Sequence, residues 1–179
     1  GHSNTAVGES SLTSNTTGDR NVAIGQNAMA VNTTGGENVA IGRNALDANQ
    51  TANANVAIGD SALTTAVNRL GNTAVGFNAA RDLDTTGVVA IGYKAMESTS
   101  TGYDCVAVGA SSLLNNSTGN ENVAVGFNAM YSNTTGNDNV AIGNGALDAN
   151  TTSSYSTAVG KDALTTSTGP YNTAMGVGA

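Results

Sequence analysis

A five-residue phrase, Asn-Val-Ala-Ile-Gly at residues 21–25, recurs with small variations from one end of the sequence to the other. Its closing glycine returns after 17 residues in eight steps and after 16 residues in two, at Gly8, Gly25, Gly42, Gly59, Gly76, Gly92, Gly109, Gly126, Gly143, Gly160 and Gly176. Self-similarity at a short fixed period is typical of a solenoid, in which each copy forms one coil stacked on the last. The repeat therefore predicts an all-β, parallel β-solenoid of about eleven 17-residue coils.

The residue two before the closing glycine is alanine in every copy, with Val or Thr before it and Ile, Val or Met after it. The two flanking residues share one face of a strand and the alanine lies on the other. A strand that is apolar on both faces is buried on both faces. One face can pack inside its own coil and the other against a further copy, which predicts an oligomer around a shared axis. The alternative is a monomer whose alanine face is exposed.

These strand positions are the predicted core and subunit-packing residues, although the residues alone do not decide which face lies inside the chain. They are Val22, Ala23, Ile24, Val39, Ala40, Ile41, Val56, Ala57, Ile58, Val123, Ala124, Val125, Val140, Ala141 and Ile142.

After the corner glycine, the third residue is small and the fourth is Leu or Met in most copies, as in Ala28 and Met29. This pattern predicts a second, shorter strand that runs back after a tight bend at the glycine. A loop of turn-forming residues follows, reading Asn-Thr-Thr-Gly at residues 15–18, 32–35 and 133–136. Asparagine also precedes the strand in eight copies, which predicts a ladder of stacked amides along the rod. No helix is expected.

Composition narrows the function classes. Six Lys and Arg face thirteen Asp and Glu, giving a net charge of −7, which argues against a nucleic-acid partner. No apolar run approaches the roughly 18 residues of a membrane helix. His2 and Cys105 are single residues of their types. A single histidine argues against histidine-dependent catalysis and a histidine-based metal site, and a single cysteine cannot form an internal disulfide. We therefore expect a protein that is not an enzyme and has no cofactor and no metal. We expect Cys105 to be buried.

Residues 1–3, Gly-His-Ser, are typical of a cloning remnant, and residues 4–179 form a single repeat domain by the unbroken period. We therefore expect the natural protein to be longer, with targeting and anchoring segments outside this sequence.

The phrase Asn-Val-Ala-Ile-Gly, followed by two variable residues and a small one, resembles the head repeat of trimeric autotransporter adhesins of the YadA-like type. Similar strings, including the Asn-Thr-Thr-Gly loop, occur in phage tail fibres, and the resemblance covers essentially the whole chain. It implies a left-handed parallel β-roll and a homotrimer. The Val and Ile positions would face the trimer axis, and small residues such as Ala23 and Ala28 would fill the core of each chain. The family's usual repeat is shorter, so the Leu or Met position and the longer loop are additions here.

The resemblance implies an extracellular protein, either on a bacterial surface and anchored through other segments, or in a virion fibre. We expect it to be a non-enzymatic surface-attachment domain that binds a host-cell surface, a glycan or the extracellular matrix through many weak contacts. Exposed aromatic rings can serve as binding platforms, so the candidate ligand-binding residues are Phe77, Tyr93, Phe127 and Tyr131. The alternative for these rings is that they fill gaps between subunits.

Two further surface patterns bear on function. Carboxylates share one register before the strand at Glu37, Asp104, Glu121 and Asp138; a solvated acidic face is favoured over a Ca²⁺ site. A row of loop threonines would suit an ice-binding solenoid, although other residues interrupt it: Thr16, Thr33, Thr85, Thr118 and Thr134. The alternatives to attachment are thus a structural spacer of a fibre and an ice-binding solenoid.

Overall fold

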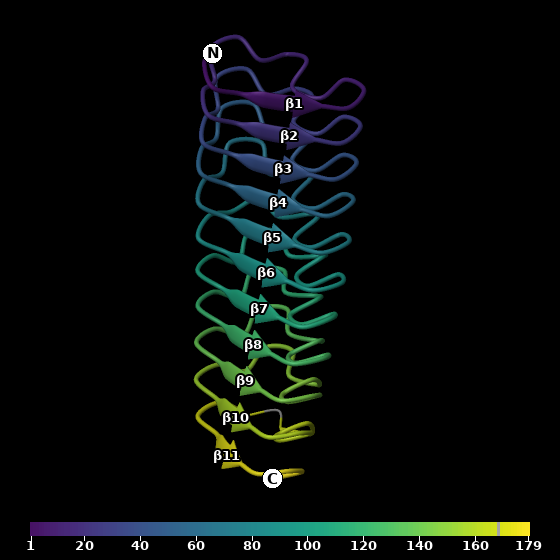
Figure 1. Ribbon diagram of the computed structural model, residues 1–179. Helices are drawn as coiled ribbons and strands as arrows, with labels where there is room; N and C mark the ends of the chain where they lie inside the picture. Colours follow the sequence, from purple (N-terminus) through teal and green to yellow (C-terminus); the bar gives the residue numbers. More distant parts are fainter. Residues whose placement is uncertain (168) are drawn as a thin grey trace.

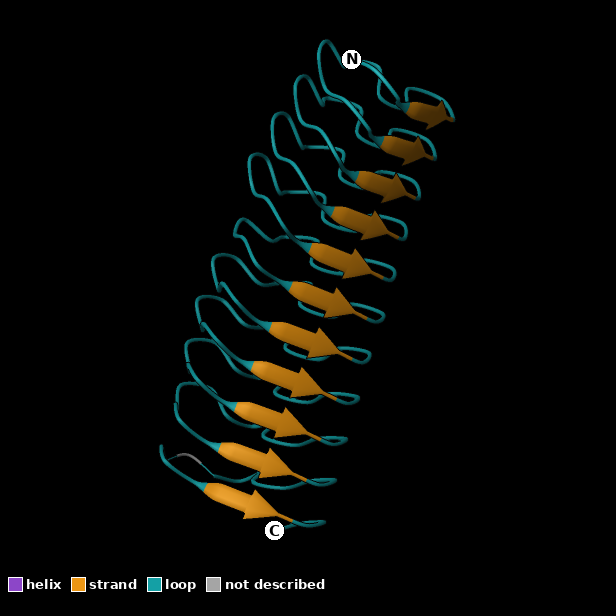
Figure 2. Ribbon diagram, turned by 60° about the vertical axis from the view of Figure 1, so that its left-hand side comes forward, coloured by secondary structure: helices purple, strands orange, loops and turns teal. Residues whose placement is uncertain are grey.

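The computed structural model describes residues 1–167 and 169–179, and these form eleven short parallel strands stacked in one sheet (Figures 1 and 2). The strands are β1 (Thr5–Val7), β2 (Val22–Ile24), β3 (Val39–Ile41), β4 (Val56–Ile58), β5 (Thr73–Val75), β6 (Val89–Ile91), β7 (Val106–Val108), β8 (Val123–Val125), β9 (Val140–Ile142), β10 (Thr157–Val159) and β11 (Thr173–Met175). Their order in the sheet is their order in the chain. The prediction of an all-β parallel solenoid is confirmed, with about ten turns.

The strands stack in register, so equivalent residues form continuous columns along the rod. Ala23 pairs with Ala40, and Ala40 with Ala57. The register survives the first 16-residue step, where Thr73 of β5 pairs with Val89 of β6. The loops therefore absorb the missing residue, and the strands keep their register.

The corner glycines are required for two separate reasons. Their φ angles lie between 126° and 141°, a region that L residues rarely adopt. A Cβ atom on Gly42 would also lie 2.4 Å from the carbonyl oxygen of Gly59 on the next coil. The coils stack so closely at this corner that no side chain fits between them.

The predicted second strand is wrong, because the residues after each corner form turns. Asn27 and Met29 have φ angles of 59° and 50°, which are left-handed and incompatible with an extended strand. The backbone still bonds along the stack: Asn27 N–H donates to Glu9 O of the previous coil at 2.9 Å, and Met29 N–H to Ala45 O of the next at 3.0 Å. Left-handed residues allow the chain to reverse within a few residues, which extended backbone cannot do.

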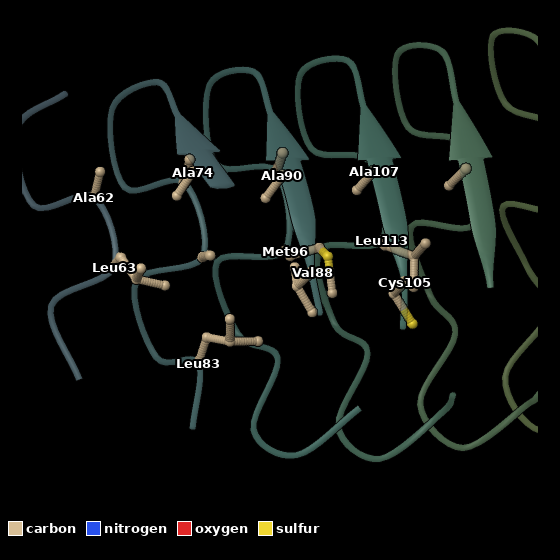
Figure 3. Packing of buried hydrophobic residues seen from close by; sticks show 14 of the residues in the cluster. Ala62, Leu63, Ala74, Leu83, Val88, Ala90, Met96, Cys105, Ala107 and Leu113 are labelled. Carbon is tan, nitrogen blue, oxygen red and sulfur yellow. The ribbon is translucent and has the colours of Figure 1, made fainter. Parts of the chain in front are cut away.

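The core lies between the sheet and these turns, inside the single chain. The strand alanines, the small residues after the corner and most of the Leu or Met residues are fully buried; Figure 3 shows Ala74, Ala90, Leu63, Met96 and Leu113 among them. The alanine face is thus the inner one, and the alternative with an exposed alanine face does not hold. The flanking Val and Ile point outward and are half-buried or exposed.

Asparagine ladders run along the interior of the coils. In the predicted ladder, the backbone N–H of Asn38 donates to Asn21 Oδ1 at 3.0 Å, and its side-chain amide donates to Ala52 O at 2.8 Å. A second ladder uses the first asparagine of the Asn-Thr-Thr-Gly loop: Asn32 Nδ2 donates to Asn15 Oδ1 at 3.0 Å. Buried amides are satisfied in this way without water.

Both ladders break near the middle of the rod. Val88 and Cys105 replace asparagine in the first ladder, and Ala66, Leu83 and Thr99 replace it in the second. Apolar packing takes over there, as Leu83, Val88 and Cys105 show in Figure 3. The change leaves one polar atom unsatisfied: Thr99 Oγ1 is a buried side-chain oxygen with no hydrogen-bond partner among the described residues.

Candidate binding surfaces

The outward face of the sheet is a strip of Val, Ile and Thr side chains two columns wide. Ile24, Ile58, Ile91 and Ile142 remain 36–41% exposed in the single chain. The strip continues over all eleven strands because the strands are in register. A continuous exposed apolar strip of this length is characteristic of an interaction surface.

The predicted packing residues divide between two environments. Ala23, Ala40, Ala57, Ala124 and Ala141 lie inside the chain. The Val and Ile residues lie on the outward strip: Val22, Ile24, Val39, Ile41, Val56, Ile58, Val123, Val125, Val140 and Ile142.

Two of the four candidate aromatic residues come together. The rings of Phe77 and Tyr93 stack with centroids 5.5 Å apart and an interplanar angle of 11°, and Lys94 Nζ lies 5.7 Å from the Tyr93 centroid. Phe127 and Tyr131 are exposed on a later coil. They do not extend the stack, because Ala110 occupies the outward position on the intervening coil.

A second aromatic stack was not predicted. Tyr155 and Tyr171 lie with ring centroids 5.1 Å apart and an interplanar angle of 4°. A sequence signal exists, since each tyrosine lies five residues before a corner glycine, Gly160 or Gly176, on successive coils.

Every Lys and Arg side chain of the described residues forms an ion pair. Arg43 Nε lies 2.9 Å from Asp60 Oδ2, and Arg69 Nε lies 2.8 Å from Asp84 Oδ1. The hydrogen bonds from these guanidinium groups lower the pKa of Asp60 and of Asp84. The remaining negative charge comes from carboxylates that have no ion pair. Since every Lys and Arg of the described residues is paired, this part of the surface has no free Lys or Arg to bind an anion.

The acidic row occupies one column of left-handed residues. Glu37, Asp104, Glu121 and Asp138 all have positive φ, and Glu37 is the member that pairs with Arg20. Within residues 1–167 and 169–179, no cluster of three or more His, Cys, Asp or Glu could hold a metal ion.

The threonines proposed as an ice-binding row do not form one row. The hydroxyl groups of Thr16 and Thr134 donate to backbone carbonyls of the next coil, both at 2.8 Å. Thr118 lies one residue further along its loop than those two, and Thr85 is buried. Shortened and altered loops therefore break the regular hydroxyl array that ice binding would require.

Cys105 is buried at a ladder position, as expected. Its Sγ lies 3.4 Å from Gly119 O and from Tyr103 O. Burial raises the pKa of the thiol to about 11, so the nucleophilic thiolate is scarce at neutral pH.

Comparisons of this chain with protein-family models, with curated proteins and with solved structures find no match. The part of the chain that the structure describes contains no helix able to cross a membrane.

Proposed function

We propose that this chain is a rod-shaped, non-enzymatic surface-attachment domain that works as a homotrimer of left-handed β-rolls. The observation that carries the proposal is the exposed strip of Val, Ile and Thr along the outward face of β1–β11. A surface of this kind is stabilised when a copy of the same chain covers it.

Self-association fits the strip better than a chance partner does. The columns on every copy repeat at the same coil spacing, so copies that lie parallel match along their whole length. Burying the exposed half of one Val or Ile side chain contributes about 1 kcal/mol. That gain recurs on each strand. The number three comes from the resemblance of the repeat to trimeric adhesin heads.

Non-enzymatic function is supported by the state of the reactive groups. The cations are held in ion pairs, and the Cys105 thiol is buried with a raised pKa. Attachment would use three copies of each exposed patch at fixed spacing, which gives avidity without a deep pocket. The candidate contact residues are Phe77, Tyr93, Phe127 and Tyr131, and the partner is a host-cell surface, a glycan or the extracellular matrix.

The setting that we propose is extracellular, on a bacterial surface or in a virion fibre, with no nucleic-acid partner and no membrane insertion by this part of the protein. A structural spacer is the competing function, because the sheet continues through every coil and would transmit a fixed distance.

Immobilised protein exposed to host cells, matrix proteins and a glycan array separates the two functions. An attachment domain retains at least one of these surfaces, and a Phe77→Ser, Tyr93→Ser variant retains it less. The Tyr155→Ser, Tyr171→Ser variant removes the other aromatic stack and is the matched control. A trimer that binds none of these surfaces is a spacer.

A further inference from the structure

A hollow of about 260 Å³ opens between three successive loops near the first coils. Its lining includes Asp19 and Arg20 before β2, Thr34, Gly36 and Glu37 before β3, and Asn53 before β4. The lining is polar and combines carboxylates, a hydroxyl, an amide and a guanidinium group around a glycine.

The hollow lies at a third, partial ladder, formed by residues six positions before a corner glycine. At several coils the backbone N–H at this register donates to a side-chain oxygen of the next coil. Gly36 N–H donates to Asn53 Oδ1 at 2.7 Å, Tyr103 N–H to Asn120 Oδ1 at 3.1 Å, and Asn120 N–H to Asn137 Oδ1 at 2.8 Å.

Gly36 lacks the side chain that would continue this ladder. Asp19 N–H accordingly has no acceptor among the described residues. A Cβ atom on Gly36 would lie 3.0 Å from Asp19 O and 3.7 Å from Asn53 Oδ1, so a side chain here would enter the hollow. Gly36 does not have a positive φ, so the backbone conformation does not require glycine. Among the described residues, the bond is also missing where the same register is held by Leu70, Thr86 and Tyr103. Each of these residues places a side chain there, whereas Gly36 does not.

We propose that the Gly36 hollow binds one neutral saccharide unit of the surface to which the protein attaches. A sugar hydroxyl or acetamido oxygen accepts the Asp19 N–H in place of the missing side chain, and sugar hydroxyls donate to the carboxylates of Asp19 and Glu37. The volume lies below the roughly 300–1,000 Å³ of pockets for drug-sized ligands, which fits a single monosaccharide.

Charge selects against an acidic sugar. Arg20 is the cation in the lining, and it pairs with Glu37. With a net charge of −7, the protein repels sialylated or sulfated glycans. The choice of a saccharide rests on the proposed attachment function, whereas the site itself rests on Gly36 and Asp19.

The test is an amide-resolved NMR titration of the full chain with N-acetylglucosamine, galactose and mannose. We expect at least one of these sugars to shift the Asp19 and Gly36 amide resonances. Gly36→Asn restores the ladder acceptor and fills the hollow, so it should weaken that sugar by about tenfold or more and slow hydrogen exchange at Asp19. Gly36→Ser is a second variant with a smaller side chain. Serine can act as the acceptor at this register, since Ser154 Oγ accepts from Asn137 N–H at 2.9 Å.

Asn120→Gly is the matched control, because it removes the same ladder acceptor on a distant coil. It should leave the sugar-induced shifts at Asp19 and Gly36 unchanged. The proposal is overturned if none of the three sugars shifts these amides, or if both Gly36 variants bind the sugar as the parent does. Cell binding separates this result from the attachment function. If the parent and Gly36→Asn adhere to cells equally well, the attachment function stands and the role of the hollow in it is overturned. If the parent adheres to no surface, the attachment function itself is overturned.

Discussion

At the scale of single residues, the corner glycines set the strictest requirement in the fold. We predict that Gly42→Ala lowers the free energy of unfolding by about 3 kcal/mol or more, because backbone strain of about 1–3 kcal/mol adds to a clash with the next coil. Gly71→Ala is the matched control: Gly71 has a φ of 71° but no atom within 4 Å of its Cβ position, so it carries the strain without the clash. Equal losses in chemical denaturation would show that stacking does not constrain the corner.

Thr99 supplies a second prediction at this scale. Its buried Oγ1 has no partner among the described residues, so Thr99→Val should raise the free energy of unfolding by about 1 kcal/mol, since it removes an unsatisfied polar group and keeps the shape. Ser112→Ala is the control, because the Ser112 hydroxyl donates to Gly109 O at 2.9 Å and its removal should destabilise. A Thr99→Val variant less stable than the parent would contradict the prediction.

Cys105 makes stability depend on alkaline pH. Burial raises the pKa of its thiol from 9.0 to about 11. A group whose folded pKa is raised contributes stability that is complete below its unfolded pKa and is lost as the pH rises through the folded value. We predict that about 2–3 kcal/mol is lost between pH 9 and pH 11. Cys105→Ala should lack this loss when unfolding is measured across that range, and an unchanged pH profile would count against a buried thiol.

At the scale of elements, complementary side chains on adjacent coils reinforce the register. Arg43 with Asp60, Phe77 with Tyr93, and Tyr155 with Tyr171 each join equivalent positions of neighbouring coils. Cross-strand pairs of this kind each contribute roughly 0.2–1 kcal/mol. Each pair is specific to its two coils. If one coil stacked on a coil other than its native neighbour, its pair would therefore be lost.

We expect the loop between β4 and β5 to be the least stable element of the stack. Ala66 replaces the ladder asparagine there, and residues 67–71 are all exposed. We predict that limited trypsin digestion cuts first after Arg69, and mass spectrometry of the fragments identifies the bond. Arg69→Gln should delay digestion. A first cut after Arg43, which lies beside a corner glycine, would place the weak point elsewhere.

The strands and their register could be predicted because an alanine between two β-forming residues returns in every copy and obeys the two-residue period of a strand. The inner position of the alanines was implied by the resemblance, since the residues alone do not decide which face lies inside. The turns after the corner could not, since left-handed Leu and Met are rare and have no sequence signal. The second ladder was hidden because its asparagines are also turn formers. The Gly36 hollow escaped prediction because it arises from a missing side chain, which is recognisable only once the coils are aligned in space.

At the scale of the whole molecule, the fold leaves one long surface without a cover. The alanine face is closed within the chain, whereas the Val and Ile face is closed only if copies associate. The paired cations and the ladders stabilise each rod internally and do not require a partner. Association and folding are therefore separable. A Lys substitution on the outward strip should weaken association between copies more than it lowers the stability of each rod.

The central claim is tested most directly by light scattering on the purified chain, with an Ile41→Lys, Ile58→Lys double variant beside it. We predict that the parent has three times the single-chain mass of 17.6 kDa. The variant, which buries a charge in the proposed seam, should return to the single-chain mass while its far-UV circular dichroism stays that of the parent. A parent mass of 17.6 kDa at every concentration would contradict the claim.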